Sequence, residues 1–233
     1  MHDPLQITTP GGSIPAYVAR PQKLPAPVIV VVHEVFGVNA DMHQSCDELA
    51  TQGYLAVCPD LFWRIAPAVE LTDRTEAERA QALALYNAFD IDAGVNDIAA
   101  VVNAARGMPG STGRVGVVGY CLGGLLAFLT AARAGADAVV AYYPGNADKY
   151  IGEAGRIASP LIVHLAEKDE YIPVDAQRKI SSALANHPQV QAYNYPGCGH
   201  AFARHRGISY DAEAAALANG RTAAFLALHL QGD

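Results

Sequence analysis

The chain has 233 residues, of which 51% are hydrophobic, and a formal net charge of −7. This length and apolar content predict one domain over residues 1–233 with a single large core. The negative charge argues against general binding to nucleic acid or anionic membranes, and no apolar run approaches the ~18 residues that a membrane-spanning helix needs.

The first part of the chain alternates strand and helix patterns. Strands are predicted at 5–9 and 14–20, around the turn Pro10-Gly11-Gly12, and at 28–35, where a β-branched run is typical of a strand buried on both faces. A helix at 39–52 and a strand at 54–59 follow. The stretch 61–71 has weak periodicity and is predicted to be a loop. Helices are expected at 75–86 and 91–105.

The second part continues this alternation. In chain order we predict a strand at 115–118, a helix at 125–133, strands at 138–143 and 161–165, a helix at 174–186, a strand at 190–195 and a helix at 212–230. Alternating strands and helices indicate a parallel sheet with helices on both faces. Ligands of such sheets bind beyond the carboxyl ends of the strands.

The cysteines and the first residues of the chain indicate the cellular compartment in which the protein is expected. The four cysteines form no C-x-x-C pair, which is typical of free thiols in a reducing cytoplasm. The segment from Met1 to Gln6 lacks a basic stretch followed by an apolar one, so no signal peptide is expected. We therefore expect a cytoplasmic protein.

A tight strand-to-helix turn follows the strand at 115–118. Its sequence is Gly119-Tyr120-Cys121-Leu122-Gly123-Gly124. Glycines two residues before and two residues after Cys121 remove side chains that would clash in such a turn. This is the G-x-S-x-G nucleophile-elbow pattern with cysteine in place of serine. It predicts that Cys121 lies at a helix N-terminus, which favours a thiolate.

Two further residues have the chemistry that a nucleophilic cysteine needs. A base must take the thiol proton, and a third group must fix the tautomer of the base. His200 follows the last predicted strand and Asp169 follows the strand before it, so both are expected at the same sheet edge as Cys121. The order nucleophile, acid, histidine matches that of α/β-hydrolases. Three nearby carboxylates compete for the acid role: Glu167, Glu170 and Asp175.

Simpler interpretations of these residues stay open. Cys121 can be a buried structural cysteine in a glycine-rich turn. Cys198 and His200 have Cys-x-His spacing, but one such pair without companions is a weak metal signal. His164 lies inside a predicted strand and is expected to be a core residue with its hydrogen bonds satisfied. We expect no metal and no cofactor, because covalent acyl transfer needs neither.

With these residues in place, the chain resembles the dienelactone hydrolase family (carboxymethylenebutenolidases) over nearly its whole length. The most specific segments are His33-Glu34-Val35-Phe36-Gly37, the cysteine elbow, Asp169 at a strand end, and Gly199-His200-Ala201-Phe202. The resemblance implies an α/β-hydrolase fold. It also implies hydrolysis of dienelactone (4-carboxymethylenebut-2-en-4-olide) to maleylacetate, a step in bacterial degradation of chloroaromatics through chlorocatechols.

The resemblance also implies roles for the catalytic residues. Cys121, His200 and Asp169 would form a triad that works through an acyl-enzyme. Glu34 would hold the resting thiol and help to ionise it when the substrate arrives. The backbone N–H groups of Val35 and Leu122 would form the oxyanion hole.

The substrate-binding residues follow from the carboxylate of the substrate. Arg79 and Arg204 match the family's carboxylate-binding arginines, and a guanidinium can bind both carboxylate oxygens. Phe36 and Tyr86 would line the pocket. Leu83 departs from the pattern, because the best-matching members have a tyrosine there. The family also implies a monomer whose partner is a small lactone or ester substrate.

Three other functions compete with this one. A related cysteine esterase or lactonase with a different substrate preference is the main alternative. A glutamine-amidotransferase-like protein also uses a cysteine elbow, but its acid follows the histidine, whereas Asp169 precedes His200. A catalytically inactive α/β module kept for binding is disfavoured by the intact nucleophile, base and acid.

Overall fold

The computed structural model describes residues 5–232. β3 (Ala26–Val32) lies in the middle of its sheet, and all 7 residues of this strand are buried. The apolar run does not alternate with polar residues, as a strand covered on both faces requires. The neighbours β4 (Leu55–Pro59) and β5 (Ser111–Tyr120) pair with it in parallel.

The sheet has eight strands in the order β1-β2-β4-β3-β5-β6-β7-β8. The pairs β1–β2 and β2–β4 are antiparallel, and the other pairs are parallel. The remaining strands are β1 (Leu5–Thr9), β2 (Gly12–Ala19), β6 (Ala138–Tyr142), β7 (Leu161–Ala166) and β8 (Val190–Tyr195). The predicted mostly parallel sheet is confirmed.

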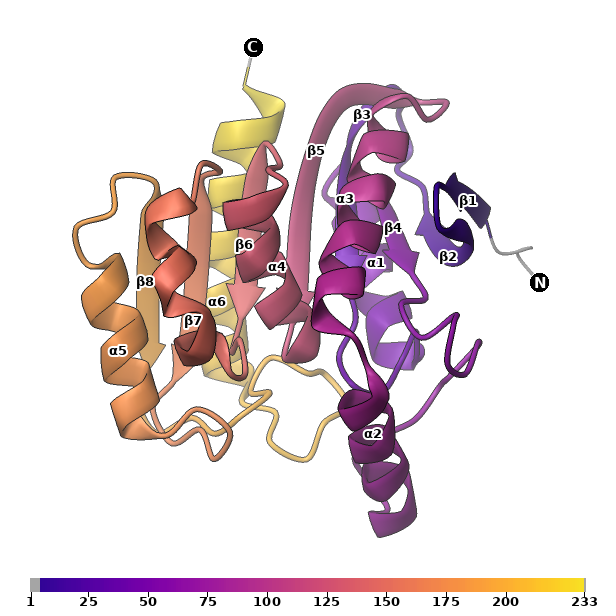
Figure 1. Ribbon diagram of the computed structural model, residues 1–233. Helices are drawn as coiled ribbons and strands as arrows, with labels where there is room; N and C mark the ends of the chain where they lie inside the picture. The colour runs from indigo at the N-terminus through magenta and orange to yellow at the C-terminus, as the bar shows by residue number, and fades with distance from the viewer. Residues whose placement is uncertain (1–4, 233) are drawn as a thin grey trace.

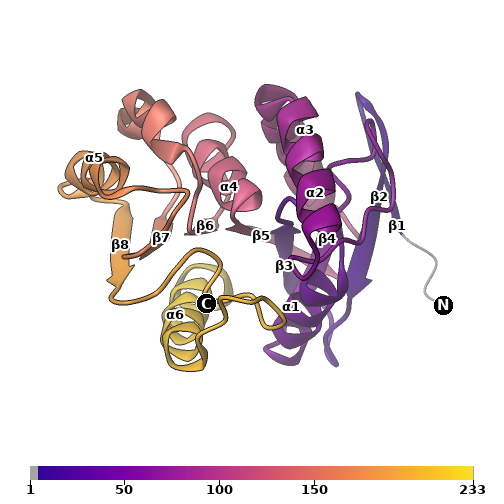
Figure 2. The ribbon, with the colours of Figure 1, turned by 90° about the horizontal axis from the view of Figure 1, so that it is seen from below.

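Helices cover both faces of this sheet. They are α1 (Ala40–Thr51), α2 (Glu76–Ala88), α3 (Ile91–Arg106), α4 (Leu122–Arg133), α5 (Val174–Leu184) and α6 (Ala212–Leu226). α1 and α6 cover one face, and α3, α4 and α5 cover the other (Figure 2). α2 lies beyond the sheet, near the loop that joins β8 to α6 (Figure 1). No described helix is long and apolar enough to cross a membrane.

Several predicted bounds shift by a few residues; β3, for example, ends at Val32 rather than at 35. The clearest differences lie at four places. α4 begins at Leu122 rather than at 125, because Gly123 and Gly124 pack against neighbouring backbone inside the helix instead of forming a turn. The last helix changes to a π-helical turn, η2 (Ala227–Gln231), and β5 begins before the predicted 115. A 3₁₀ segment, η1 (Ala147–Arg156), was not predicted; its glycines at 152 and 155 break any clear helical pattern.

Candidate active site

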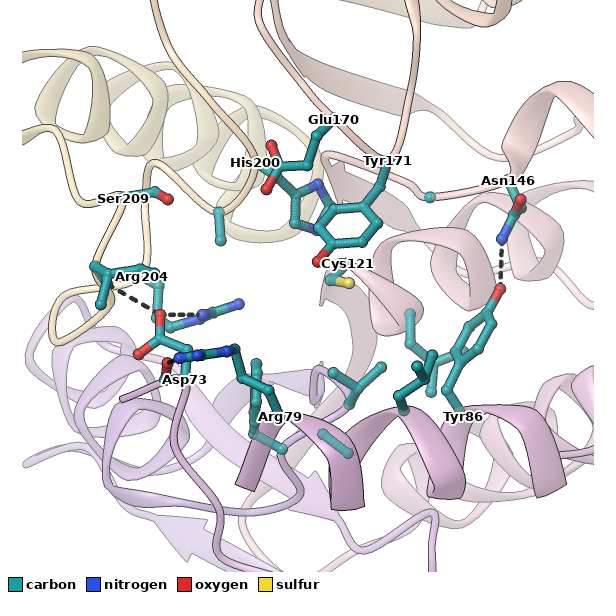
Figure 3. Close-up of a pocket in the computed structure, with 18 residues that line it drawn as sticks. Asp73, Arg79, Tyr86, Cys121, Asn146, Glu170, Tyr171, His200, Arg204 and Ser209 are labelled. Carbon is teal, nitrogen blue, oxygen red and sulfur yellow. Dashed lines mark hydrogen bonds and ion pairs between the residues drawn. The ribbon is translucent and has the colours of Figure 1, made fainter. Parts of the chain in front are cut away.

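The turn at Cys121 has the strained backbone that its sequence predicts. Cys121 has φ 54° and ψ −112°, between the end of β5 and the start of α4. A Cβ atom on Gly119 would lie 1.9 Å from the carbonyl oxygen of Gly123, and a Cβ atom on Gly123 would lie 2.1 Å from that of Val32. Only glycine fits both places. The half-buried Cys121 lines a cavity of about 270 Å³ at the carboxyl edge of the sheet (Figure 3).

His200 and Asp169 form a buried pair beside this cysteine. Nδ1 of His200 lies 2.8 Å from Oδ2 of Asp169. The other carboxylate oxygen of Asp169 accepts hydrogen bonds from the backbone N–H groups of Tyr171 and Ile172. The acid is therefore fixed from both sides, and Nε2 of His200 is left for another partner. That atom is buried and has no hydrogen-bond partner within residues 5–232.

The charges around His200 favour its protonated form. Burial lowers the pKa of His200, but the neighbouring Cys121 and the bond to Asp169 raise it more strongly, to about 10. Imidazolium and thiolate stabilise each other in such a pair. The arrangement can therefore supply a nucleophilic sulfur together with a proton donor.

The competing carboxylates have other surroundings. Glu167 accepts a hydrogen bond from the backbone N–H of Gly197, and Asp175 is exposed, 3.5 Å from Arg178. Glu170 is exposed at the cavity. Asp169 is the carboxylate that bonds to His200.

Glu34 belongs to a buried ion-pair cluster with Arg204 and Asp73. Nε of Arg204 donates to Oε2 of Glu34, and its Nη1 donates to Oδ2 of Asp73 at 2.7 Å. Burial lowers the pKa of Arg204, but Glu34 raises it more, so the guanidinium stays charged. Oε1 of Glu34 has no hydrogen-bond partner in the described part of the chain, and no hydrogen bond there joins Glu34 to Cys121.

The predicted substrate-binding residues meet in one cavity. Arg79, Arg204, Phe36 and Tyr86 all line it, as does Leu83. Nη1 of Arg79 donates to the backbone carbonyl of Asp73, so the exposed side chain of Arg79 is held at the border of the cavity (Figure 3). The Arg204 guanidinium stacks over the ring of Phe36 at 4.7 Å.

The two backbone groups named for the oxyanion hole border the same space. Val35 and Leu122 line the cavity with Cys121. The Leu122 N–H is one of the first of α4, which have no acceptor within the helix. The Val35 N–H donates to no backbone carbonyl within residues 5–232. Both groups are available to a substrate oxygen.

Two further residues shape the site and were missed from the sequence. Tyr143, with φ 36°, packs its ring against His200 at a centroid distance of 5.0 Å. His33 is fully buried, accepts a hydrogen bond from the Leu61 N–H and lies 2.6 Å from the Glu34 carbonyl oxygen, so it fixes the segment before Val35. His33 stands in one of the segments that carry the family resemblance, and both residues directly follow buried strands, but no role was predicted for either.

His164 has the structural role expected of it. It is fully buried, and its two ring nitrogens bond to the hydroxyls of Tyr195 and Thr222. Cys198 lies 3.7 Å from the carbonyl oxygen of Pro196. Among the described residues there is no group of three or more His, Cys, Asp or Glu that could hold a metal ion.

The fold and the site together define a class. A cysteine at a strand-to-helix elbow, with a His–Asp pair at the carboxyl edge of a mostly parallel sheet, is the arrangement of an α/β-hydrolase. Residues 14–230 match the Dienelactone hydrolase family. The chain belongs to this family and is a hydrolase that acts on lactone or ester bonds.

Relatives and solved structures agree with this assignment. The chain is 48% identical over 221 residues to a "Putative carboxymethylenebutenolidase" of Azospirillum brasilense, covering 94% of this chain and 95% of the relative. It is 44% identical over 217 residues to a carboxymethylenebutenolidase of Pseudomonas putida, covering 93% and 92%. A crystal structure titled "Putative Dienelactone Hydrolase", from Klebsiella pneumoniae, superposes with a TM-score of 0.82 at 28% identity, covering 96% of this chain and 97% of that one.

Proposed function

We propose that the protein hydrolyses dienelactone to maleylacetate through an acyl-enzyme on Cys121, with His200 and Asp169 as the other members of the triad. The observation that carries this proposal is that one cavity is lined by Cys121 and His200 and also by Arg79 and Arg204. A nucleophile beside two cations suits a carboxylic ester or lactone that also carries a free carboxylate.

In the first step the Cys121 thiolate attacks the lactone carbonyl carbon. The carbonyl oxygen becomes an oxyanion and accepts hydrogen bonds from the N–H groups of Val35 and Leu122. The bond between the carbonyl carbon and the ring oxygen then breaks. The ring oxygen leaves as an enolate, which takes a proton from Nε2 of His200 and stays tethered to the thioester.

Water completes the reaction. Neutral His200, held by Asp169, takes a proton from a water molecule, and the resulting hydroxide attacks the thioester carbonyl. The carbon–sulfur bond breaks, and the Cys121 thiolate is restored beside protonated His200. The released enol tautomerises to the ketone of maleylacetate.

Glu34 couples this chemistry to substrate binding. In the free enzyme its carboxylate is held by Arg204. A substrate carboxylate that binds Arg204 competes for the same guanidinium. Glu34 is then free to take the proton of a Cys121 thiol and pass it to Nε2 of His200, which gives the thiolate and the protonated ring that the first step uses.

The alternative is a cysteine esterase or lactonase with a different substrate preference. The observation that favours it is Leu83, an apolar side chain that lines the cavity and is 59% exposed. An apolar group at the mouth suits an uncharged alkyl or aryl portion better than a polar one does.

The biological setting is also a proposal. We infer a role in the degradation of chloroaromatics through chlorocatechols, since dienelactones arise there. The described cysteines are all free thiols, as in a reducing cytoplasm. We take the working unit to be a monomer, because one chain supplies every residue that the mechanism uses.

Steady-state hydrolysis of cis- and trans-dienelactone by the wild type and by Arg79→Ala tests the function. We expect fast wild-type turnover that collapses in Arg79→Ala and persists in Arg178→Ala, a matched change on the exposed face of α5. Poor turnover of both lactones, with good hydrolysis of p-nitrophenyl acetate, would favour the alternative. Loss of all activity in Cys121→Ala is required in either case.

A further inference from the structure

One end of the cavity carries two polar side chains that the mechanism does not use. Tyr86 comes from α2 and Asn146 from the turn before η1, and both line the cavity. Nδ2 of Asn146 donates a hydrogen bond to the hydroxyl of Tyr86. Figure 3 places this pair on one side of Cys121, with Arg79 and Arg204 on the other. The nucleophile therefore lies between two polar ends.

The conformation of Asn146 directs its side chain into the cavity. Its backbone is left-handed, with φ 64° and ψ 11°, and it directly precedes η1. An asparagine directly before a helix often caps it with its side chain. Here the side chain makes no capping bond to η1 and instead reaches a residue 60 positions away in the chain. The pair is thus a contact between two separate elements at one end of the cavity.

This pair presents a hydrogen-bond donor. Because the Tyr86 hydroxyl accepts from Asn146, its own proton is free to bond to an acceptor in the cavity. Burial raises the pKa of Tyr86, which keeps that proton in place at neutral pH. Among the described residues that line the cavity there is no lysine, and the two arginines, Arg79 and Arg204, both lie at the other end (Figure 3). An uncharged acceptor fits the Tyr86 end better than an anion does.

α2 arranges the chemistry along the cavity. Arg79, Leu83 and Tyr86 are spaced by four and three residues, so they share one helix face, and all three line the cavity. From Arg79 to Tyr86 the helix axis rises about 10 Å. The face therefore presents a cation, an apolar side chain and a hydroxyl in that order.

The order of these side chains along α2 can be compared with the order of groups in the substrate. In dienelactone the acidic arm is attached on the side of the ring oxygen, the leaving group. If that arm binds the arginines while the carbonyl lies at Cys121, the acyl side of the substrate points toward Tyr86. We propose that Tyr86 and Asn146 form a second subsite, which binds an uncharged hydrogen-bond acceptor on the acyl side of an acidic ester or lactone. This inference rests on the proposed function for the positions of the carboxylate and the carbonyl.

Two esters of nearly equal shape test the subsite. 3-Carboxyphenyl methoxyacetate and 3-carboxyphenyl butanoate have the same acidic leaving group, and their acyl chains differ by an ether oxygen in place of a methylene. The ratio of their kcat/KM values is measured for the wild type and for Tyr86→Phe, so that their different intrinsic reactivity cancels. We expect the ratio to fall about 3- to 10-fold in Tyr86→Phe, the effect of one neutral hydrogen bond.

Tyr193→Phe is the matched control. Its hydroxyl bonds to Gln191 on β8, away from the cavity, so this change should leave the ratio as in the wild type. An unchanged ratio in Tyr86→Phe, with both esters cleaved, overturns the subsite and leaves the proposed function intact. If the wild type cleaves neither ester nor dienelactone, the proposed function fails. In that case the subsite is tested by binding to Cys121→Ala. The dissociation constants of the two esters are measured for this variant with and without the additional change Tyr86→Phe. If Tyr86→Phe weakens the preference for the methoxyacetate over the butanoate by about the same 3- to 10-fold, the subsite is supported; if the preference is unchanged, the subsite is overturned.

Discussion

Tyr143 packs edge-on against His200, with their ring centroids 5.0 Å apart, and its fully buried hydroxyl has no hydrogen-bond partner among the described residues. Oε1 of Glu34 and Nε2 of His200 are likewise buried without a partner there. An unpaired buried polar group costs about 1–3 kcal/mol. We expect these three groups to find partners when a substrate is bound, as unsatisfied polar groups at functional sites do.

Removing the Tyr143 hydroxyl should therefore lower the activity without lowering the stability of the fold. In Tyr143→Phe we expect the free energy of unfolding to stay the same or to rise by about 1 kcal/mol, because no hydrogen bond is lost. We expect kcat to fall about tenfold with little change in KM, which corresponds to ~1.4 kcal/mol of lost stabilisation in the transition state. Urea denaturation and steady-state kinetics measure the two effects.

The neighbouring Tyr142 gives the control. Its hydroxyl lies 2.9 Å from Oδ1 of Asn219 and 2.7 Å from Oγ1 of Thr222. Tyr142→Phe should lower the free energy of unfolding by about 1 kcal/mol and change kcat less. Equal losses of stability in the two variants would show that the Tyr143 hydroxyl is paired after all.

The two arginines should differ sharply in what they contribute to the fold. Arg204 is 8% exposed and neutralises both Glu34 and Asp73, so Arg204→Ala leaves buried carboxylates unpaired. We expect this variant to lose about 3–5 kcal/mol of unfolding free energy. Arg79 is exposed and bonds to one backbone carbonyl, so Arg79→Ala should change stability by about 0.5 kcal/mol or less. Thermal denaturation of both proteins checks this, and similar losses would contradict the buried cluster.

The pKa of His200 predicts a pH-dependent stability. The folded pKa is about 10, above the unfolded value of about 6.5, so folding favours the protonated ring. This stabilisation is fully present below about pH 6.5 and is lost as the pH rises through about 10. The difference in unfolding free energy between the wild type and His200→Gln should therefore shrink between these pH values. A difference that stays constant would contradict the raised pKa.

The partner that raises this pKa can be identified separately. Cys121 makes the largest contribution that raises the pKa of His200, so Cys121→Ala should lower it. NMR titration of the His200 ring measures the midpoint in both proteins. An unchanged midpoint would contradict the contribution of Cys121 and leave the bond to Asp169 as the cause of the raised pKa.

The sequence predicted those parts of the site whose pattern is local. The elbow could be found because Gly119 and Gly123 flank Cys121 at fixed spacing, and both are required by contacts below 2.5 Å. The bond between His200 and Asp169 could be expected because each residue follows a parallel strand. Asn146 and Tyr143 could not be found, since their roles depend on positive φ angles and on partners far away in the chain. The pairing of Arg204 with Glu34 spans 170 residues and has no local signal.

The elbow also allows a test of its packing. A Cβ atom on Gly123 would lie 2.1 Å from the carbonyl oxygen of Val32, which belongs to a buried central strand and cannot shift. Gly123→Ala should therefore lower the melting temperature by 10 °C or more, roughly the effect of ~4 kcal/mol in a chain of this length, and abolish hydrolysis.

Gly220 is the matched control for this change. It is exposed in the middle of α6, and an added Cβ atom would meet no atom within 4 Å. Gly220→Ala should raise the free energy of unfolding by about 0.5–1 kcal/mol, because alanine loses less backbone entropy than glycine in a helix. Calorimetry and ester hydrolysis on both proteins measure the contrast. A Gly123→Ala protein that melts near the wild-type temperature and stays active would mean that β3 and α4 can move apart at the elbow without loss of stability. The close packing around Gly123 would then not be what holds Cys121 in its strained conformation and positions the nucleophile.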